Sequence, residues 1–448
     1  MQRAHRGEQP YWMMIALSAM LGQPGLPGAG FSFGHGSMNS VGNPRIDTPA
    51  PLLPTGPNPS GLAIPVARIC DMLLHPGESY AFQGETHRYP DIHLMHWAGG
   101  NPFHHHQQLN RLVEGWQKPD TVIVQDIVWT PAAQMADIVL PVTTTLERND
   151  IGGSSRDRFV FAMHQAIAPQ HQARNDFDIF RALAARLGVE QAFTEGKDEM
   201  LWLKGMYDEM KAQARNARVA LPPFDMFWAS NNYIRFPIPQ ENTQWVRFAD
   251  FRENPLLNPL GTPSGKIEIY SDAIAKMGYE DCKAIPTWMP PHEWYRGPEA
   301  EKYPLSLNTG HPINRLHSQL DNTPLRKKYA VADREAIWIH PKDASARGIS
   351  EGDLVRAFND RGQILVGAVI TDNVREGVVR ISEGAWFDPA DPSQPGSLCK
   401  NGNVNCLTFD VGSSSLAQGN CGQMSQLQIE KYTGPALKNT AHDVPVGA

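Results

Sequence analysis

Residues 91–141 read DIHLMHWAGGNPFHHHQQLNRLVEGWQKPDTVIVQDIVWTPAAQMADIVLP, and this stretch decides the fold class. Its short apolar runs predict two buried strands, at 91–97 and 121–124, and a third strand at 137–140. Apolar residues at helical spacing predict a helix between the first two strands, at 104–116, and a shorter one at 130–136. Because strands and helices alternate, we expect an α/β domain with a parallel sheet.

The composition excludes several classes of function. The chain has 448 residues and a net charge of −7, without a basic block, so no nucleic-acid partner is expected. It contains no apolar run of about 18 residues, so no membrane span is expected. Its five cysteines include no Cys-x-x-Cys pair, which argues against a disulfide scaffold, a zinc ribbon or an iron–sulfur cluster.

The sequence outside this stretch predicts two further regions. Residues 10–22 predict a helix, followed by a loop rich in Gly and Pro that extends to residue 62. Near residue 303 the pattern changes to hairpins, such as 353–358 returning as 363–370, which predict a β-barrel. We therefore expect three domains: the end of a truncated α/β domain with a long loop at 1–62, an α/β dinucleotide-binding domain with covering helices and a linker at 63–300, and a C-terminal β-barrel at 301–448.

Two features near the first strands are candidates for ligand binding. The turn Gly99-Gly100-Asn101 follows a strand, where parallel sheets bind ligands and where glycines let a phosphate approach the backbone. Asp126 follows the next strand and could hold a ribose or accept two N–H bonds from guanine. The alternatives are a plain turn and a capping aspartate. Three consecutive histidines, 104–106, cannot converge on one ion from a helix, so they predict no metal site.

The segment 309–319, TGHPINRLHSQ, is the densest polar segment. An arginine among histidines, amides and hydroxyls suits a phosphate or a polar heterocycle, although a hydrogen-bonded loop is the alternative. The loops 401–406 and 412–418 could line the same site, and taken alone they are ordinary turns. The chain has no Ser-His-Asp elbow, Walker loop or His-Glu-x-x-His sequence, so we predict no catalytic nucleophile and no protein ligand to a metal.

Several stretches taken together carry a family resemblance. They are AHRGEQPYW at 4–12, WAGGNP at 97–102, TPAAQMADIVLP at 130–141, RLHSQ at 315–319, GNVNCLT at 402–408 and SSSLAQ at 413–418. The chain resembles the dimethyl sulfoxide reductase family, and within it the branch of trimethylamine-N-oxide, dimethyl sulfoxide and biotin sulfoxide reductases. Members are roughly twice as long, so the chain looks like a C-terminal half.

The resemblance implies a cofactor and a reaction. The cofactor is molybdenum held by two molybdopterin guanine dinucleotides (bis-MGD), bound by the α/β domain and by a double-psi-like barrel. The reaction is oxo transfer from an S-oxide or N-oxide to molybdenum, with electrons from a separate donor such as a c-type cytochrome. The family location is the periplasm, with the cytoplasm as the alternative because this chain shows no export signal.

The resemblance also places the serine that ligates molybdenum in the missing N-terminal half. That half is therefore the expected partner, and the chain alone is expected to be inactive. The alternatives are a non-catalytic cofactor-binding remnant, a split-gene partner, or an unrelated α/β nucleotide-binding protein.

Twelve positions carry over from the family as cofactor contacts. They are Gly99, Gly100, Asn101, His106, Asp126, Asp176, His311, Arg315, His317, Ser318, Gln319 and Asn403. Arg361, in the predicted hairpin turn 359–362, is expected to be solvated and to lie outside the site.

Overall fold

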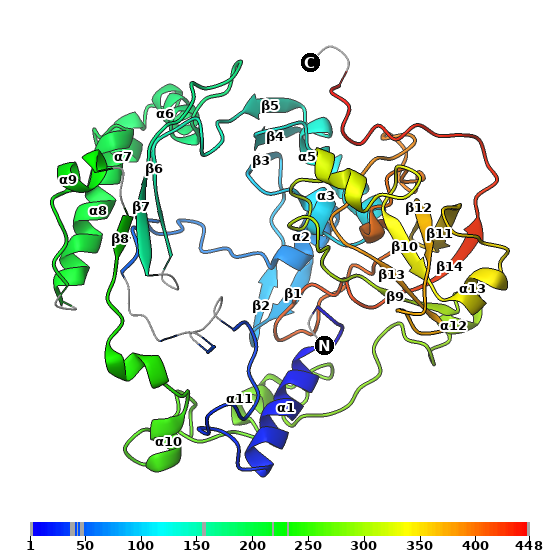
Figure 1. Cartoon of the computed structure of the whole chain (residues 1–448), viewed down its shortest axis with the longest axis horizontal. Helices are drawn as coiled ribbons and strands as arrows, with labels where there is room; N and C mark the ends of the chain where they lie inside the picture. The colour runs from blue at the N-terminus through cyan, green and yellow to red at the C-terminus, as the bar shows by residue number, and fades with distance from the viewer. Residues whose placement is uncertain are drawn as a thin grey trace. The chain divides into compact units, whose positions relative to one another are not determined.

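The computed structural model describes residues 3–35, 41–42, 44, 49–154, 158–216, 219–230 and 233–445 (Figure 1). The chain divides into two compact units. The first comprises Met1–Met13, Ala63–Val139 and Ile269–Ala448, and the second comprises Met14–Leu62 and Leu140–Glu268. This division reports packing alone, so the predicted domain boundaries after residues 62 and 300 stay a prediction.

A parallel sheet lies in the first unit, as the sequence predicted. Its strands are β3 (Leu94–Ala98), β4 (Thr121–Asp126) and β5 (Ile138–Pro141), in that order. Strands β3 and β4 run parallel, with Leu94 opposite Thr121. The short helix α5 (Pro131–Gln134) connects β4 to β5. The predicted α/β class is therefore confirmed.

The helix predicted at 104–116 is broken in two. Helix α3 spans Pro102–His105, and α4 spans Leu109–Trp116. The break arises because His106 has extended backbone angles and Gln108 has a left-handed conformation, with φ of 47°. The prediction of one helix was wrong because the apolar spacing of α4 hides this local change of backbone.

The C-terminal region forms a closed barrel, as predicted. Its strands follow the order β10-β12-β11-β14-β9-β13 and combine parallel pairs, such as β10 with β12, with antiparallel pairs, such as β11 with β12. The strands are β9 (Leu305–Asn308), β10 (Ala336–Ile339), β11 (Leu354–Asn359), β12 (Gly362–Ile370), β13 (Val378–Ile381) and β14 (Gln426–Lys431).

One apolar core joins the barrel to the α/β part of the first unit. The inner face of α4, including Leu109, Leu112 and Trp116, belongs to the same buried cluster as barrel residues such as Ile337. Phe103 of α3 stacks on Phe387 with ring centroids 5.7 Å apart. The turn before α3 is consequently held in place by the barrel.

Shorter elements complete the first unit. Helix α1 (Glu8–Met20) begins in it and ends in the second unit, and the strands β1 and β2 form a hairpin that the sequence did not reveal. The elements are η1 (Val66–Arg68), α2 (Ile69–Leu74), β1 (Ser79–Phe82), β2 (Glu85–Arg88), α11 (Asp272–Met277), α12 (Glu299–Lys302), η3 (Pro324–Lys328), α13 (Pro341–Ser345) and η4 (Val404–Cys406).

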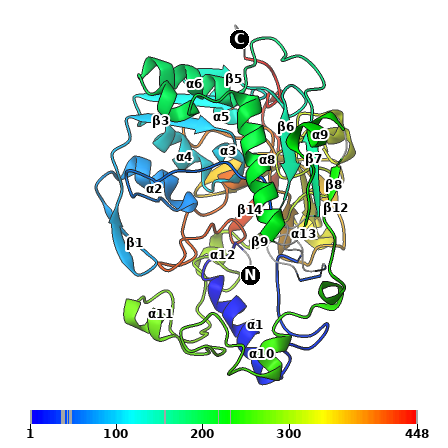
Figure 2. The ribbon, with the colours of Figure 1, turned by 90° about the vertical axis from the view of Figure 1, so that its left-hand side faces the viewer.

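The second unit has its own sheet and core. Tyr207, Phe224 and Phe227 pack in a separate buried cluster (Figure 2 shows α8 running alongside α9 and the sheet). Its strands follow the order β6-β7-β8, which the sequence did not reveal. The elements are β6 (Asp150–Gly153), β7 (Phe159–Met163), α6 (Asp176–Arg186), α7 (Glu190–Thr194), α8 (Glu199–Asn216), α9 (Phe224–Ala229), β8 (Tyr233–Arg235), η2 (Gln240–Gln244) and α10 (Ala249–Glu253).

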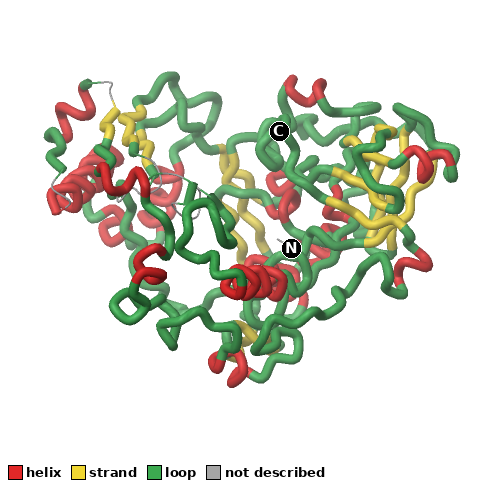
Figure 3. The backbone as a smooth tube through the Cα atoms, turned by 60° about the horizontal axis from the view of Figure 1, so that its bottom comes forward, coloured by secondary structure: helices red, strands yellow, loops and turns green. Residues whose placement is uncertain are grey.

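Loops make up much of the chain, in keeping with its 38 glycines and 37 prolines (Figure 3). Among the described residues, none of the helices has the length and apolar character needed to cross a bilayer.

The barrel wall allows a test of the fold. A methyl group added at Gly367 of β12 would overlap the backbone carbonyl oxygen of Val331. We expect Gly367→Ala to destabilise the chain by about 1–3 kcal/mol, because backbone atoms cannot make room easily. Gly205→Ala in α8 is the control, since its methyl meets nothing within 4 Å and should stabilise by about 0.5–1 kcal/mol. Thermal unfolding would report both effects, and equal shifts would contradict the packing of β12.

Candidate functional site

The turn after β3 is shaped to receive a ligand. Gly99 and Gly100 both have positive φ, of 72° and 73°, a conformation that side-chain-bearing residues rarely adopt, and both are exposed. Asn101 begins α3, and its side-chain oxygen accepts the Phe103 amide at 3.0 Å. The side-chain nitrogen of Asn101, Nδ2, is buried and has no hydrogen-bond partner among the described residues. The Gly99 N–H donates to the Gln125 carbonyl at 3.2 Å, and the Gly100 carbonyl accepts the Trp97 indole N–H at 3.0 Å. The turn therefore combines exposed glycines with one unsatisfied side-chain donor.

Three asparagines from the barrel loops secure α3. Asn403 donates to the Phe103 carbonyl at 2.8 Å, Asn405 to that of His104 at 2.8 Å, and Asn420 to that of His105 at 3.1 Å. A helix of four residues cannot satisfy its own last carbonyls, so these amides replace the missing helical bonds. Asn403, predicted as a cofactor contact, is thus brought beside the Gly99–Asn101 turn, but its amide is used within the protein.

Glu383 holds the two histidines of the segment 309–319. The Nδ1 atoms of His311 and His317 each lie 2.6 Å from the same oxygen, Oε1. Glu383 is almost fully buried, whereas both imidazoles are more than half exposed. Burial by itself would raise the pKa of Glu383, but the bonds from His311 and His317 outweigh it and hold the pKa below its ordinary value. The carboxylate is therefore an acceptor for two exposed rings.

A chain of contacts joins these histidines to α3. The Arg3 guanidinium donates to Glu383 Oε2 at 3.4 Å and to the side-chain oxygen of Asn420 at 3.1 Å. Asn420 in turn donates to the carbonyl of His105 at the end of α3. The structure thus connects the end of α3 to the predicted polar segment through a chain of hydrogen bonds. Arg3, Glu383, Asn405 and Asn420 are the site residues that sequence reasoning missed.

Arg315 lies inside the protein, and its predicted contact with the cofactor stays a prediction. Its Nη2 donates to the Glu383 carbonyl at 2.7 Å, and its Nε donates to the His317 carbonyl at 2.9 Å. Its Nη1 lies 3.0 Å from Glu335, and the guanidinium stacks on the Tyr329 ring. The polar density of this segment is therefore satisfied largely within the chain, which favours a structural role for Arg315.

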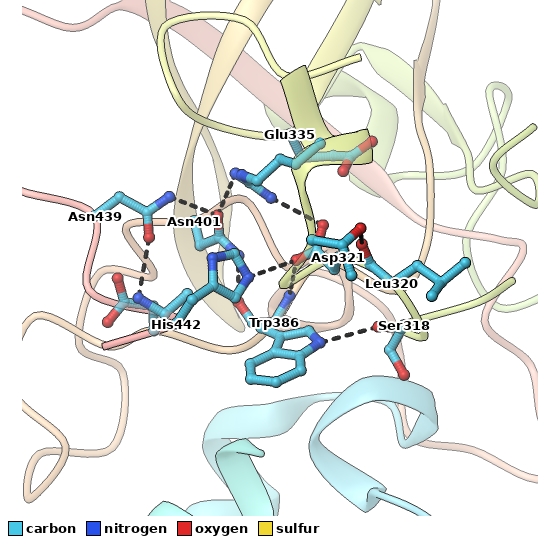
Figure 4. Close-up of polar contacts among 12 residues, drawn as sticks. Ser318, Leu320, Asp321, Glu335, Trp386, Asn401, Asn439 and His442 are labelled. Atoms are coloured by element: carbon cyan, nitrogen blue, oxygen red, sulfur yellow. Dashed lines mark hydrogen bonds and ion pairs between the residues drawn. The ribbon is translucent and has the colours of Figure 1, made fainter. Parts of the chain in front are cut away.

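Asp321 organises the buried network beneath the segment (Figure 4). Its oxygens accept from Arg326 at 2.9 Å, from the Tyr329 hydroxyl at 2.6 Å and from the Trp386 amide at 3.2 Å. His442 contacts the same carboxylate at 3.1 Å. Although burial would raise the pKa of Asp321, the bond from His442 and the charge of Arg326 lower it. The carboxylate therefore stays ionised at neutral pH.

Ser318 and Gln319 continue the segment. The Ser318 carbonyl accepts the Trp386 indole N–H at 3.0 Å, which fixes the backbone of the segment against the barrel loop (Figure 4). The side chain of Gln319 is exposed. Both positions lie on the same segment as His311 and His317, and their predicted contacts stay predictions.

His106 lies in a closed ionic cluster. The ring is fully buried, neither of its nitrogens has a hydrogen-bond partner among the described residues, and burial lowers its pKa. Cys70 and Asp410 lie close enough to share an ion with it. However, Asp410 already pairs with Arg111 at 2.6 Å and with Arg68 at 3.4 Å, and two positive charges oppose a metal cation.

Asp126 and Asp176 take separate places. Asp126 accepts the Ile127 amide at 2.8 Å and the Thr130 hydroxyl at 2.7 Å, which is the local bonding of a turn aspartate. Burial raises its pKa against these bonds. Asp176 is the first residue of α6 in the second unit. Their roles toward a ligand stay predictions.

Arg361 corrects one expectation. The sequence predicted a solvated side chain, but the guanidinium pairs with Glu293 and donates to the Leu407 carbonyl at 2.8 Å. The prediction was wrong because the hairpin turn packs against a loop distant in sequence. Arg361 is therefore not a solvent-exposed arginine that could serve as a control for substitutions of Arg315.

Comparisons with known proteins were made on the whole chain. Residues 1–186 match the family described as Molybdopterin oxidoreductase, and residues 305–423 match the Molydopterin dinucleotide binding domain. The whole chain is 51% identical to a dimethyl sulfoxide/trimethylamine N-oxide reductase of Rhodobacter capsulatus and covers 56% of it. It is 50% identical to a trimethylamine-N-oxide reductase of Haemophilus influenzae, over 99% of this chain and 56% of that protein. The chain thus spans about half the length of the curated relatives it matches.

A solved structure shares the fold. The acetylene hydratase of Pelobacter acetylenicus matches with a TM-score of 0.57 at 21% identity, covering 77% of this chain and 45% of that one. At this identity the match supports the architecture alone.

The buried Glu335 predicts a pH dependence of stability. Burial raises its pKa from 4.5 to about 7, despite the nearby Arg315 guanidinium. Between these values the folded chain retains a proton that the unfolded chain has released, so stability falls as the pH rises through this window. Glu335→Gln should remove this contribution to the loss of stability with rising pH. Melting temperatures at about pH 5 and about pH 8 test this, and the same decline in variant and parent would refute the assignment.

Proposed function

The chain belongs to the molybdopterin oxidoreductase family, and from this premise we propose that it forms the cofactor-holding part of an enzyme that reduces S-oxides or N-oxides. The resemblance predicted from the sequence is confirmed. So is the cofactor, molybdenum held by molybdopterin guanine dinucleotide. The reading as an unrelated nucleotide-binding protein is accordingly set aside.

A connected set of groups carries this proposal, most of them exposed and one, the Asn101 side-chain amide, buried. The Gly99–Asn101 turn presents exposed backbone and an unsatisfied amide, which suit a phosphate or another acceptor. His311 and His317 present exposed ring edges, which suit the polar edge of a heterocycle. Arg3, Asn420 and Glu383 connect these two groups. A dinucleotide with a heterocyclic end needs both kinds of contact.

Each part of the site has a separate task in this proposal. The turn would hold a phosphate through the backbone N–H groups of Gly100 and Asn101, since that of Gly99 donates to the Gln125 carbonyl. The two histidines would hold the pterin. Asn403 and Asn405 keep the turn in place from the barrel side. When bound, molybdenum supplies the two-electron oxo-transfer chemistry. Asp126 and Asp176 remain the proposed contacts to the nucleotide end, with Gln319 and Ser318 on the pterin side.

The finer points of the function are also proposals. The relatives reduce dimethyl sulfoxide or trimethylamine N-oxide by their names, and we propose the same substrate class here, biotin sulfoxide included. A c-type cytochrome donor, a pair of dinucleotides and a periplasmic location follow from the family. Because the chain covers 56% of its relative, reductase activity is proposed for the whole protein and not for this chain alone.

The proposal is tested by cofactor content. The chain would be purified from a host that makes the dinucleotide cofactor, and molybdenum and acid-released GMP would be measured per chain. Bound molybdenum accompanied by twice its amount of GMP, one from each dinucleotide of the pair, supports the proposal, and the absence of both would refute it. Viologen-linked turnover, measured with the part of a relative that this chain does not cover supplied as a second chain, separates an enzyme part from a cofactor-binding protein that reduces no oxide.

Asp126 provides a prediction about nucleotide recognition. A carboxylate can accept hydrogen bonds from both adjacent guanine donors, N1–H and the 2-amino group. An asparagine side chain would instead place its own NH2 group against one of these donors. Asp126→Asn should lower dinucleotide affinity by about 1–3 kcal/mol. Stability should change little, because the amide can still serve Ile127 and Thr130. GMP content and melting temperature measure the two effects. Unchanged GMP content would leave Asp126 as a turn cap.

A further inference from the structure

Glu383 makes an uncommon arrangement with two histidines. One carboxylate oxygen accepts from both His311 Nδ1 and His317 Nδ1, and the two rings meet edge to face with centroids 4.6 Å apart. A carboxylate is an acceptor only, so both Nδ1 atoms carry the proton. Nε2 of neither ring has a hydrogen-bond partner among the described residues. Both rings are therefore held in one tautomer with Nε2 free.

The backbone around Glu383 is fixed as firmly as its side chain. Its carbonyl accepts Arg315 Nη2, and Arg315 also binds the His317 carbonyl. A Cβ at Gly384 would overlap that same His317 carbonyl, so only glycine allows the two segments to approach so closely. Arg315 thereby links the carboxylate and one of its histidines through their main chains.

His317 itself shows local strain. Its φ is 51°, a left-handed conformation that a residue with a side chain adopts at a free-energy cost. Such a conformation persists where the surrounding contacts stabilise it, and here the hydrogen bonds with Glu383 and Arg315 do so. The segment is thus built to aim the His317 ring.

We propose that Glu383 is a positioning residue for the cofactor: it holds His311 and His317 with Nδ1 protonated, so that both Nε2 atoms accept hydrogen bonds from N–H groups of the pterin. This inference rests on the proposed function. The arrangement parallels the carboxylate that orients an imidazole ligand from behind, where loss of the carboxylate weakens binding roughly 10–100-fold. Glu383 itself needs no contact with the cofactor.

The test separates positioning from folding. Glu383→Gln would be compared with Glu335→Gln, which changes a buried carboxylate that contacts Arg315 but neither histidine. Imidazole nitrogen NMR on the full chain, above the histidine titration range, reports the tautomers. The parent and Glu335→Gln should show Nδ1–H for His311 and His317. Glu383→Gln should shift both toward Nε2–H, and unchanged tautomers would overturn the proposal.

Cofactor content gives the second measurement. In Glu383→Gln, molybdenum and GMP retained after dialysis should fall roughly tenfold or more, while Glu335→Gln retains them. The double variant that combines His311→Ala with His317→Ala provides a further comparison. Adding Glu383→Gln to it should cause no further loss of molybdenum and GMP. A full further loss would show that Glu383 acts only through folding and would overturn the inference.

The failure of the proposed function is distinguishable from that of this inference. If the parent chain binds neither molybdenum nor GMP, the proposed function fails and the cofactor role of Glu383 fails with it. The tautomer result then still decides whether Glu383 orients the two rings. If the parent binds both and Glu383→Gln binds them equally, the inference alone is refuted.

Discussion

The last carbonyls of a four-residue helix are the constraint on which the site depends. Helix α3 is too short to satisfy them, and Asn403, Asn405 and Asn420 do so from the barrel loops. These bonds hold the Gly99–Asn101 turn against a barrel that begins about two hundred residues later. The turn, the barrel and the histidine pair are therefore linked by one hydrogen-bond network, because Arg3 connects Asn420 to Glu383.

Local pattern predicted much of the fold, for physical reasons. Strands of a parallel sheet are short apolar runs, so β3, β4 and β5 were visible, although only β4 is largely buried. The β11–β12 hairpin carries its turn in sequence. The pairing of β14 with β9 was not predictable, since it joins the last strand of the barrel in the sequence to the first. The break between α3 and α4 was hidden because it depends on the backbone of His106 and Gln108.

The site was predictable only in part. The dense segment 309–319 required polar partners, and that reasoning holds, but Arg315 found its partners inside the chain. Glu383 gave no local signal, because its importance comes from His311, 72 residues earlier. An acid two residues after a strand, before a glycine, is the one sequence feature that could have drawn attention to it.

The long separation between α3 and its asparagines also sets the order of events during synthesis. Asn403 lies 300 residues after Phe103, so the ribosome completes the helix long before its capping amides exist. At about 5–20 residues per second, the interval is roughly 15–60 seconds. Throughout it the turn lacks its fixed shape, and no tight ligand can yet be held there. The final shape of the turn is consequently reached late, once the barrel loops that carry these asparagines have been made.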